Sequence, residues 1–140
     1  MIKSLFCFIF GLIGSFFAIA FGGWSSGLTT LIIFLAADYI TGLIVAGVFQ
    51  NSTHTNNGGL ESRTALKGIF RKFAIIFVVA LSNRLDILLH CDYIMNACII
   101  AFISSELISL VENLGLMGIP IPSAITKAIS VLKEKEDELK

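Results

Sequence analysis

The chain has 140 residues, of which 56% are hydrophobic and only 14% charged, and its mean hydropathy is +0.88. An average soluble domain is about 45–50% apolar and about 25% charged, and a chain this short leaves roughly a third of its extended surface in water. The composition therefore excludes an ordinary soluble domain and predicts a small, all-α integral membrane protein. Ten basic residues balance ten acidic ones, so no net basic field is present to attract nucleic acid.

The first predicted membrane span covers residues 4–21 and ends at the turn sequence Gly22-Gly23-Trp24-Ser25-Ser26. A helical span needs about 20 mostly apolar residues, and a Trp ring is favoured at the membrane interface. The second predicted span covers residues 27–49 and places Asp38 near its middle. The polar, Asn- and Gly-rich segment Gln50–Gly59 then predicts a loop.

A secretory signal peptide is the alternative interpretation of the first span. Lys3, the apolar stretch that follows and Ala18-Ile-Ala20 imitate its three regions. However, the apolar run is longer than the usual signal-peptide core and only one lysine precedes it. We therefore expect the segment to be retained as a membrane helix.

The third predicted span covers residues 69–89 and carries Asn83, Arg84 and Asp86 near one end, where polar groups are tolerated. The fourth covers residues 93–113, with Glu106 inside it. Glycines and prolines interrupt the pattern before a charged tail at residues 123–140, in which Ile125, Ile129 and Leu132 have helical spacing. The organisation predicted is a four-span membrane domain, residues 1–122, followed by a cytoplasmic amphipathic helix.

Basic residues predict the orientation of these spans, because cytoplasmic loops are enriched in Lys and Arg. With the N-terminus inside, nine of the ten basic residues are cytoplasmic and only Arg84 is outside. Both termini are then cytoplasmic, in a bacterial inner membrane. The loop before the third span holds four topology determinants, which also suit contact with anionic lipid: Arg63, Lys67, Arg71 and Lys72.

Asp38 and Glu106 are the leading candidates for a functional role. A charge at the centre of a bilayer costs roughly 2.5–3.5 kcal/mol on insertion scales, so each carboxyl is expected to face protein or water. No basic residue is expected at their depth, so each must be protonated, hydrogen-bonded to nearby hydroxyls or hydrated. A pore-lining or trigger role is one interpretation, and a structural hydrogen bond is the other.

Small and polar residues recur at helical spacing on three spans. Those on the first span have the spacing that allows close helix packing, either within the chain or between copies. Those on the second and fourth spans are candidates for oligomer contacts or for lining a pore. The packing stripe is Gly11, Ser15, Ala18 and Gly22; the polar set is Asp38, Thr41 and Gly42 with Ser105, Glu106, Ser109, Glu112 and Asn113.

The sequence contains no recognised catalytic or metal-binding motif. His54 and His90 stand alone, and the three cysteines, Cys7, Cys91 and Cys98, lack metal-ligand spacing and suit apolar packing better than a disulfide. We therefore expect no enzyme activity and no cofactor.

Several motifs in series resemble the bacteriophage holin family, which includes phage-lysis and toxin-secretion holins. They follow one another over about residues 22–140. In order, they are Phe21-Gly-Gly-Trp24, Asp38-Tyr-Ile-Thr-Gly42, Ser62, Lys67-Gly68-Ile-Phe-Arg71-Lys72, Ser105-Glu106-Leu-Ile-Ser109-Leu-Val-Glu112-Asn113 and Gly118-Ile-Pro120-Ile-Pro122, before the Lys/Glu-rich tail.

The resemblance implies a protein that oligomerises in the bacterial cytoplasmic membrane and opens lesions there. An endolysin or a large toxin then leaves the cytoplasm without necessarily touching the holin. A small proton-coupled transporter is the main alternative, because buried carboxyls on four spans would suit one. A membrane accessory subunit whose tail binds a partner is the other.

Overall fold

The structure is a computed structural model that describes residues 1–140, and it is entirely helical, which confirms the predicted all-α class. It contains no strand. Its five helices are α1 (Ile2–Phe21), α2 (Ser26–Gly47), α3 (Ser62–Leu89), α4 (Ile94–Leu116) and α5 (Ser123–Glu138).

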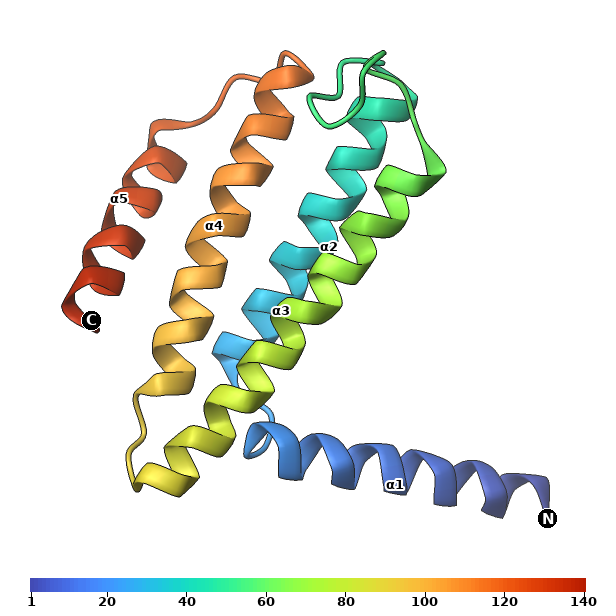
Figure 1. The fold of residues 1–140 in the computed structure, drawn as a ribbon, viewed down its shortest axis with the longest axis vertical. Coiled ribbons are helices and arrows are strands. Elements are labelled where there is room, and N and C mark those ends of the chain that lie inside the picture. Colours follow the sequence, from blue (N-terminus) through green and yellow to red (C-terminus); the bar gives the residue numbers. More distant parts are fainter.

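The helices α2, α3 and α4 lie side by side as a bundle in which α3 runs antiparallel to the other two (Figure 1). The α2–α4 pair makes the largest contact between helices. The helix α5 returns along α4 in the opposite direction, whereas α1 projects sideways from the end of the bundle where α2 begins and α3 ends (Figure 1). The segment between α2 and α3 lies at the other end.

The apolar core fills the half of the bundle nearest α1. Its members recur at steps of three or four residues, which places them on the inward face of each helix. They are Phe21 from α1, Leu28, Leu31 and Leu35 from α2, Ile75 and Val79 from α3, and Ile99 and Ile103 from α4. Towards the other end of the bundle the same inward faces become polar.

The turn between α1 and α2 agrees with the prediction from Gly22-Gly23. Both glycines have positive φ, 69° and 105°, a conformation that costs glycine little because it has no Cβ. The side chain of Asn83 on α3 donates to the carbonyl of Ala20 at 2.9 Å and fixes the end of α1 to the bundle. The Ser25 hydroxyl caps α2 by accepting from Leu28 N at 3.1 Å.

The helix α3 begins seven residues before the predicted start of the third span, at Ser62 instead of residue 69. The other three predicted spans agree with their helices to within three residues at each end. By length and composition, α1, α2 and α4 are suited to cross a membrane. The helix α3 is not among them, because it carries four basic residues in its first half and Arg84 and Asp86 in its second.

The outer surface is unusually apolar. Only 17 of the 140 residues are buried, and large apolar side chains are exposed along α1 to α4. Soluble monomers rarely expose continuous apolar surface of this extent. The surface therefore suits lipid or further protein.

Three of the four residues in the small-residue stripe of α1 are exposed and pack against no other helix. Gly11, Ser15 and Ala18 are exposed, and a Cβ added at Gly11 would meet nothing within 4 Å. In this arrangement these three residues contact no other helix, since α1 points away from the bundle (Figure 1). Only Gly22 lies close to another helix, where an added Cβ would be 3.0 Å from Asn83 Oδ1.

The helix α5 confirms the predicted amphipathic pattern of the tail. Ile125, Ile129 and Leu132 are half-buried on the side that faces α4, and Leu132 packs against the core. The lysines of α5 are exposed. This contact gives the charged tail a fixed place beside the bundle.

Asp86, near the end of α3, holds the beginning of α4. Its carboxylate accepts the backbone N–H groups of Ile94 and Met95, each at 2.9 Å, and the thiol of Cys91 at 3.2 Å. The first N–H groups of a helix have no partner within the helix, so Asp86 acts as a cap supplied by the preceding helix. The same carboxylate thus joins α3 to α4.

We predict that Asp86→Ala destabilises the protein. Loss of a capping carboxylate costs about 0.5–2 kcal/mol, and the buried N–H groups lose their acceptor. Thermal unfolding of the purified protein in an uncharged detergent measures the effect. Asp92→Ala, which removes an exposed acid from the same connection, is the matched control and should leave the midpoint unchanged. Equal midpoints for the two variants would contradict the capping role.

Candidate functional site: a buried ion cluster beside a polar cavity

Three charged residues continue the inward faces of the apolar core. Asp38 follows Leu35 by three residues on α2, Glu106 follows Ile103 by three on α4, and Lys72 precedes Ile75 by three on α3. Residues three apart on a helix share a face. The three charged side chains are therefore directed towards one another at the end of the apolar core.

Lys72 Nζ donates to Asp38 Oδ2 and to Glu106 Oε2, and it forms an ion pair with each carboxylate. Glu106 is 1% exposed, so it belongs to the most buried residues of the chain. We call Asp38, Lys72 and Glu106 the ion cluster. Two carboxylates share one ammonium, so the fully ionised cluster carries one net negative charge.

The expectation that no base lies at the depth of Asp38 and Glu106 is therefore wrong. It followed from starting the third span at residue 69, which places Lys72 near the membrane surface. Because α3 begins at Ser62, Lys72 lies ten residues from the end of its helix; Asp38 and Glu106 lie nine and ten residues from the corresponding ends of theirs. At a rise of 1.5 Å per residue, all three lie about 14–15 Å from the end of the bundle that carries the α2–α3 connection.

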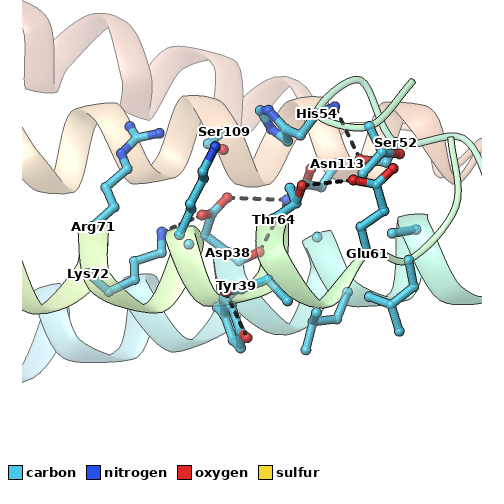
Figure 2. Close-up of a pocket in the computed structure, with 18 residues that line it drawn as sticks. Asp38, Tyr39, Ser52, His54, Glu61, Thr64, Arg71, Lys72, Ser109 and Asn113 are labelled. Carbon is cyan, nitrogen blue, oxygen red and sulfur yellow. Dashed lines mark hydrogen bonds and ion pairs between the residues drawn. The ribbon is translucent and has the colours of Figure 1, made fainter. Parts of the chain in front are cut away.

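Asn113 extends the ion cluster towards the end of the bundle. Its amide Nδ2 donates to Asp38 Oδ1 at 3.2 Å, to the Asp38 carbonyl at 3.2 Å and to Thr41 Oγ1 at 3.0 Å. A Cβ added at Gly42 would lie 3.8 Å from the same amide nitrogen. Figure 2 shows Asp38 between Lys72 and Asn113. The cluster and Asn113 together join α2, α3 and α4.

Tyr39 sets the spacing of α2 and α3 beside the cluster. Its ring lies against Gly68, where an added Cβ would be only 3.3 Å from the ring, and its hydroxyl donates to the Ala65 carbonyl at 3.3 Å. A larger residue at position 68 would displace either the ring or the helix. Gly68 therefore allows the close approach that brings Lys72 to Asp38.

A half-open cavity of about 350 Å³ lies above the ion cluster, between α2, α3, the end of α4 and the α2–α3 connection. Asp38, Lys72 and Asn113 contribute to its wall (Figure 2). Most of the other lining side chains are polar or charged: those of Ser52, His54, Thr55, Glu61, Thr64, Lys67, Arg71 and Ser109. Water therefore has a path from the end of the bundle to the edge of the cluster.

The structure brings together part of the predicted polar set. Asp38, Thr41, Glu106 and Asn113 are linked through hydrogen bonds and ion pairs, Gly42 lies beside Asn113, and Ser109 lines the cavity. Ser105 and Glu112 are exposed instead, on the outer side of α4. Steps of four and three residues predict that Ser105, Ser109 and Glu112 share one face of the helix. In the structure, however, Glu106 and Asn113 occupy the face that points inward.

Lys72 is the residue whose role the sequence reasoning missed. The sequence predicts it, with Arg63, Lys67 and Arg71, as a topology determinant, yet the spacing of these residues already distinguishes it. Arg63, Lys67 and Arg71 recur every four residues and share one face of a helix, whereas Lys72 lies 100° further round at 3.6 residues per turn. The sequence therefore already indicates that the Lys72 side chain points in a different direction from the other three basic residues.

We predict that Lys72→Met destabilises the bundle more than any single removal of an exposed charge. Removing one partner of a buried ion pair typically costs about 3–5 kcal/mol, because the remaining charge stays uncompensated. Thermal unfolding in uncharged detergent measures the loss. The triple variant with Asp38→Asn and Glu106→Gln should regain most of it. Lys133→Met is the control, and a single variant as stable as this control would contradict the role of the cluster.

Comparison with known proteins places most of this chain in one family. The profile of the bacteriophage holin family matches residues 15–134, which include the ion cluster, the cavity and most of α5. No solved structure matches the chain.

Relatives at moderate identity cover most of its length. An uncharacterised protein of Halalkalibacterium halodurans is 37% identical over 124 residues, which cover 84% of this chain and 86% of the relative. An uncharacterised protein of Listeria monocytogenes is 33% identical over 132 residues, covering 92% and 89%. A probable holin of Bacillus phage phi105 is 31% identical over 102 residues, covering 72% and 70%. The chain belongs to the bacteriophage holin family.

Proposed function

We propose that this protein is a holin that accumulates in the bacterial cytoplasmic membrane, oligomerises and opens lesions through which an endolysin or a large toxin leaves the cytoplasm. The observation that carries the proposal is the family match over residues 15–134, which covers nearly the whole chain. The apolar outer surface supports it, because a bilayer or further copies would cover that surface. The proposed protein catalyses no reaction and needs no cofactor.

The proposed membrane arrangement has four spans, formed by α1 to α4, with both termini in the cytoplasm. For α3 to cross, its charged side chains must face protein or water, and the contact of Lys72 with Asp38 and Glu106 gives one of them such a place. For α1 to cross, it must reorient relative to the bundle about the Gly22-Gly23 turn. For α5 to lie in the cytoplasm, it must leave α4 about the segment from Gly118 to Pro122.

We propose that the ion cluster is the trigger. In the monomer it keeps three charges hidden between α2, α3 and α4, where each has a partner. Once copies assemble, the same groups, with Ser109 and Thr41, would line water, which charged groups strongly prefer to an apolar surrounding. A change in the protonation of either acid alters the charge that Lys72 and Asn113 must balance. Separation of the three charged side chains is then coupled to opening of the lesion.

The main test is inducible expression with and without a cytoplasmic endolysin. We predict abrupt loss of culture density only when both are present, because the endolysin reaches the cell wall only through the lesion. Without the endolysin, cells should lose membrane potential but keep their shape. Gradual proton leakage with no release of folded protein would instead support a proton-coupled transporter, which the cavity beside Asp38 also suits.

Removal of residues 123–140 tests the accessory-subunit alternative. Unchanged lysis after this removal would exclude it.

Variants of the two acids test the trigger. We predict that Asp38→Asn and Glu106→Gln each shift the time of permeabilisation, because each leaves Lys72 with one carboxylate in place of two. Glu112→Gln is the matched control on α4, since Glu112 is exposed and outside the cluster. Crosslinking reports oligomerisation in parallel. If both acid variants keep wild-type timing and wild-type oligomers, the cluster is not the trigger.

Cys91 tests the proposed orientation, which places the α3–α4 connection outside the cell. We predict that a membrane-impermeant maleimide labels it from the outer side of spheroplasts. Partial burial and the hydrogen bond to Asp86 raise the pKa of the Cys91 thiol. Because the thiolate is the reacting form, labelling should be slow at neutral pH and faster as the pH rises towards that pKa. Asp86→Asn should speed labelling at neutral pH.

Cys91→Ser, which keeps Cys7 and Cys98, is the control and should remove the label. Labelling that appears only after the membrane is permeabilised would place the connection in the cytoplasm and contradict the four-span arrangement.

A further inference from the structure

Two cations on one wall of the cavity have no counter-ion. Lys67 and Arg71 both line the cavity from α3, four residues apart, and neither side chain takes part in an ion pair or a hydrogen bond within the chain. Arg63 lies one turn before them on the same face and is also unpaired. The third lining cation, Lys72, is different, because it is held by two carboxylates.

No acid near the cavity contacts these cations. Asp38 is already bound to Lys72 and accepts from Asn113. Glu61 precedes α3 and is reached only by the Thr64 hydroxyl, at 3.4 Å. Like charges four residues apart on a helix destabilise it, and a half-enclosed cavity screens them less than open solvent does. The α3 wall of the cavity therefore presents two cationic side chains that no acid contacts.

Uncommitted hydrogen-bond donors lie on the same side of the cavity. Neither the hydroxyl of Ser109 nor the imidazole of His54 takes part in a side-chain hydrogen bond within the chain; at His54 only the backbone N–H does so, by donating to the Ser52 hydroxyl. Figure 2 shows the side chains of Arg71, Ser109 and His54 along one side of the cavity, from α3, α4 and the α2–α3 connection respectively. Three separate elements thus supply donors to one space.

The α2–α3 connection that carries His54 has a defined shape. Ser52 N donates to the Gly58 carbonyl at 3.0 Å, and the Thr55 hydroxyl donates to the Gly59 carbonyl at 2.9 Å. Gly58 has φ +73°, and a Cβ there would lie 2.2 Å from the Gln50 carbonyl oxygen, so only glycine fits. The Asn51 side chain ties the segment to the end of α4 through the Leu116 carbonyl, at 3.4 Å. These contacts give the connection an ordered conformation, in which it forms one wall of the cavity.

We propose that this cavity binds a phosphate group, held by Lys67 and Arg71 with Ser109 and His54 as further donors. A guanidinium fork matches two phosphate oxygens, an ammonium supplies a point charge, and a hydroxyl completes the donor set. The size of the cavity, about 350 Å³, suits a phosphate with a small polar substituent. The phosphate comes either from the headgroup of an anionic phospholipid at this end of the bundle or from free phosphate. This site does not depend on lesion formation.

Calorimetric titration of the full-length protein in an uncharged maltoside detergent tests the proposal. The probes are short-chain phosphatidylglycerol, short-chain phosphatidylcholine and inorganic phosphate. We expect one phosphatidylglycerol per chain, bound more tightly than phosphatidylcholine, because choline cancels the phosphate charge. Binding of inorganic phosphate that competes with the lipid identifies the phosphate group alone as the ligand. Binding of phosphatidylglycerol alone identifies the lipid as its source, and either result supports the site.

Matched variants separate this site from general charge attraction. Lys67→Gln with Arg71→Gln should weaken binding about tenfold or more, as expected when two charge-assisted contacts are lost. Lys133→Gln with Lys135→Gln removes the same charge from exposed positions of α5 and should leave binding unchanged. Arg71→Lys keeps the positive charge but removes the guanidinium group, so we expect a smaller loss of affinity than in the double variant, with unchanged helix content. Equal losses in the two double variants, or no binding of any anionic probe to the wild-type protein, would overturn the proposal.

Discussion

The contact of Lys72 with Asp38 and Glu106 is the constraint around which the bundle is organised. One ammonium satisfies carboxylates from two other helices, so α2, α3 and α4 must hold a single register and depth for all three charges to meet. A buried charge without a partner is costly, and here every buried side-chain nitrogen and oxygen has a hydrogen-bond partner. The cluster therefore specifies one arrangement of the three helices more strictly than apolar packing would.

The ion cluster also separates two halves of the bundle, one with an apolar interior and one with a polar interior that opens to water. On the side of α1, leucine, isoleucine and valine close the interior against water. On the side of the α2–α3 connection, the same helix faces carry polar and charged side chains and open into a cavity. In a soluble protein large apolar side chains are mostly buried, whereas here many of them are exposed on the outer surface. An apolar exterior around a polar interior agrees with membership of a membrane-protein family.

The contacts of the peripheral helices explain which parts of the chain are free to rearrange. The helix α1 is fixed only near its C-terminal end, by Phe21 in the core and by the Asn83 hydrogen bond to Ala20. The helix α5 is held by a half-buried apolar stripe and forms no ion pair with the bundle. Neither attachment involves the ion cluster. The proposed movements of α1 and α5 in a membrane therefore leave the three-helix centre intact.

Local sequence patterns were enough to predict the helical class, the approximate helix ranges, the polar connection at Gln50–Gly59 and the amphipathic tail, because apolar periodicity and glycine or proline breaks act locally along the chain. They also identified Asp38, Glu106 and Asn113 as unusual, since polar groups inside apolar helices are costly wherever the helices lie. Only the packing of the helices shows that Lys72 meets both acids, that Ser105 and Glu112 face outward, and that Gly11, Ser15 and Ala18 of the α1 stripe are exposed. Those outcomes depend on where α3 begins and how each helix is rotated. Both are fixed by contacts between residues far apart in the chain, so a local pattern can show that Lys72 faces a different way but cannot identify its partners.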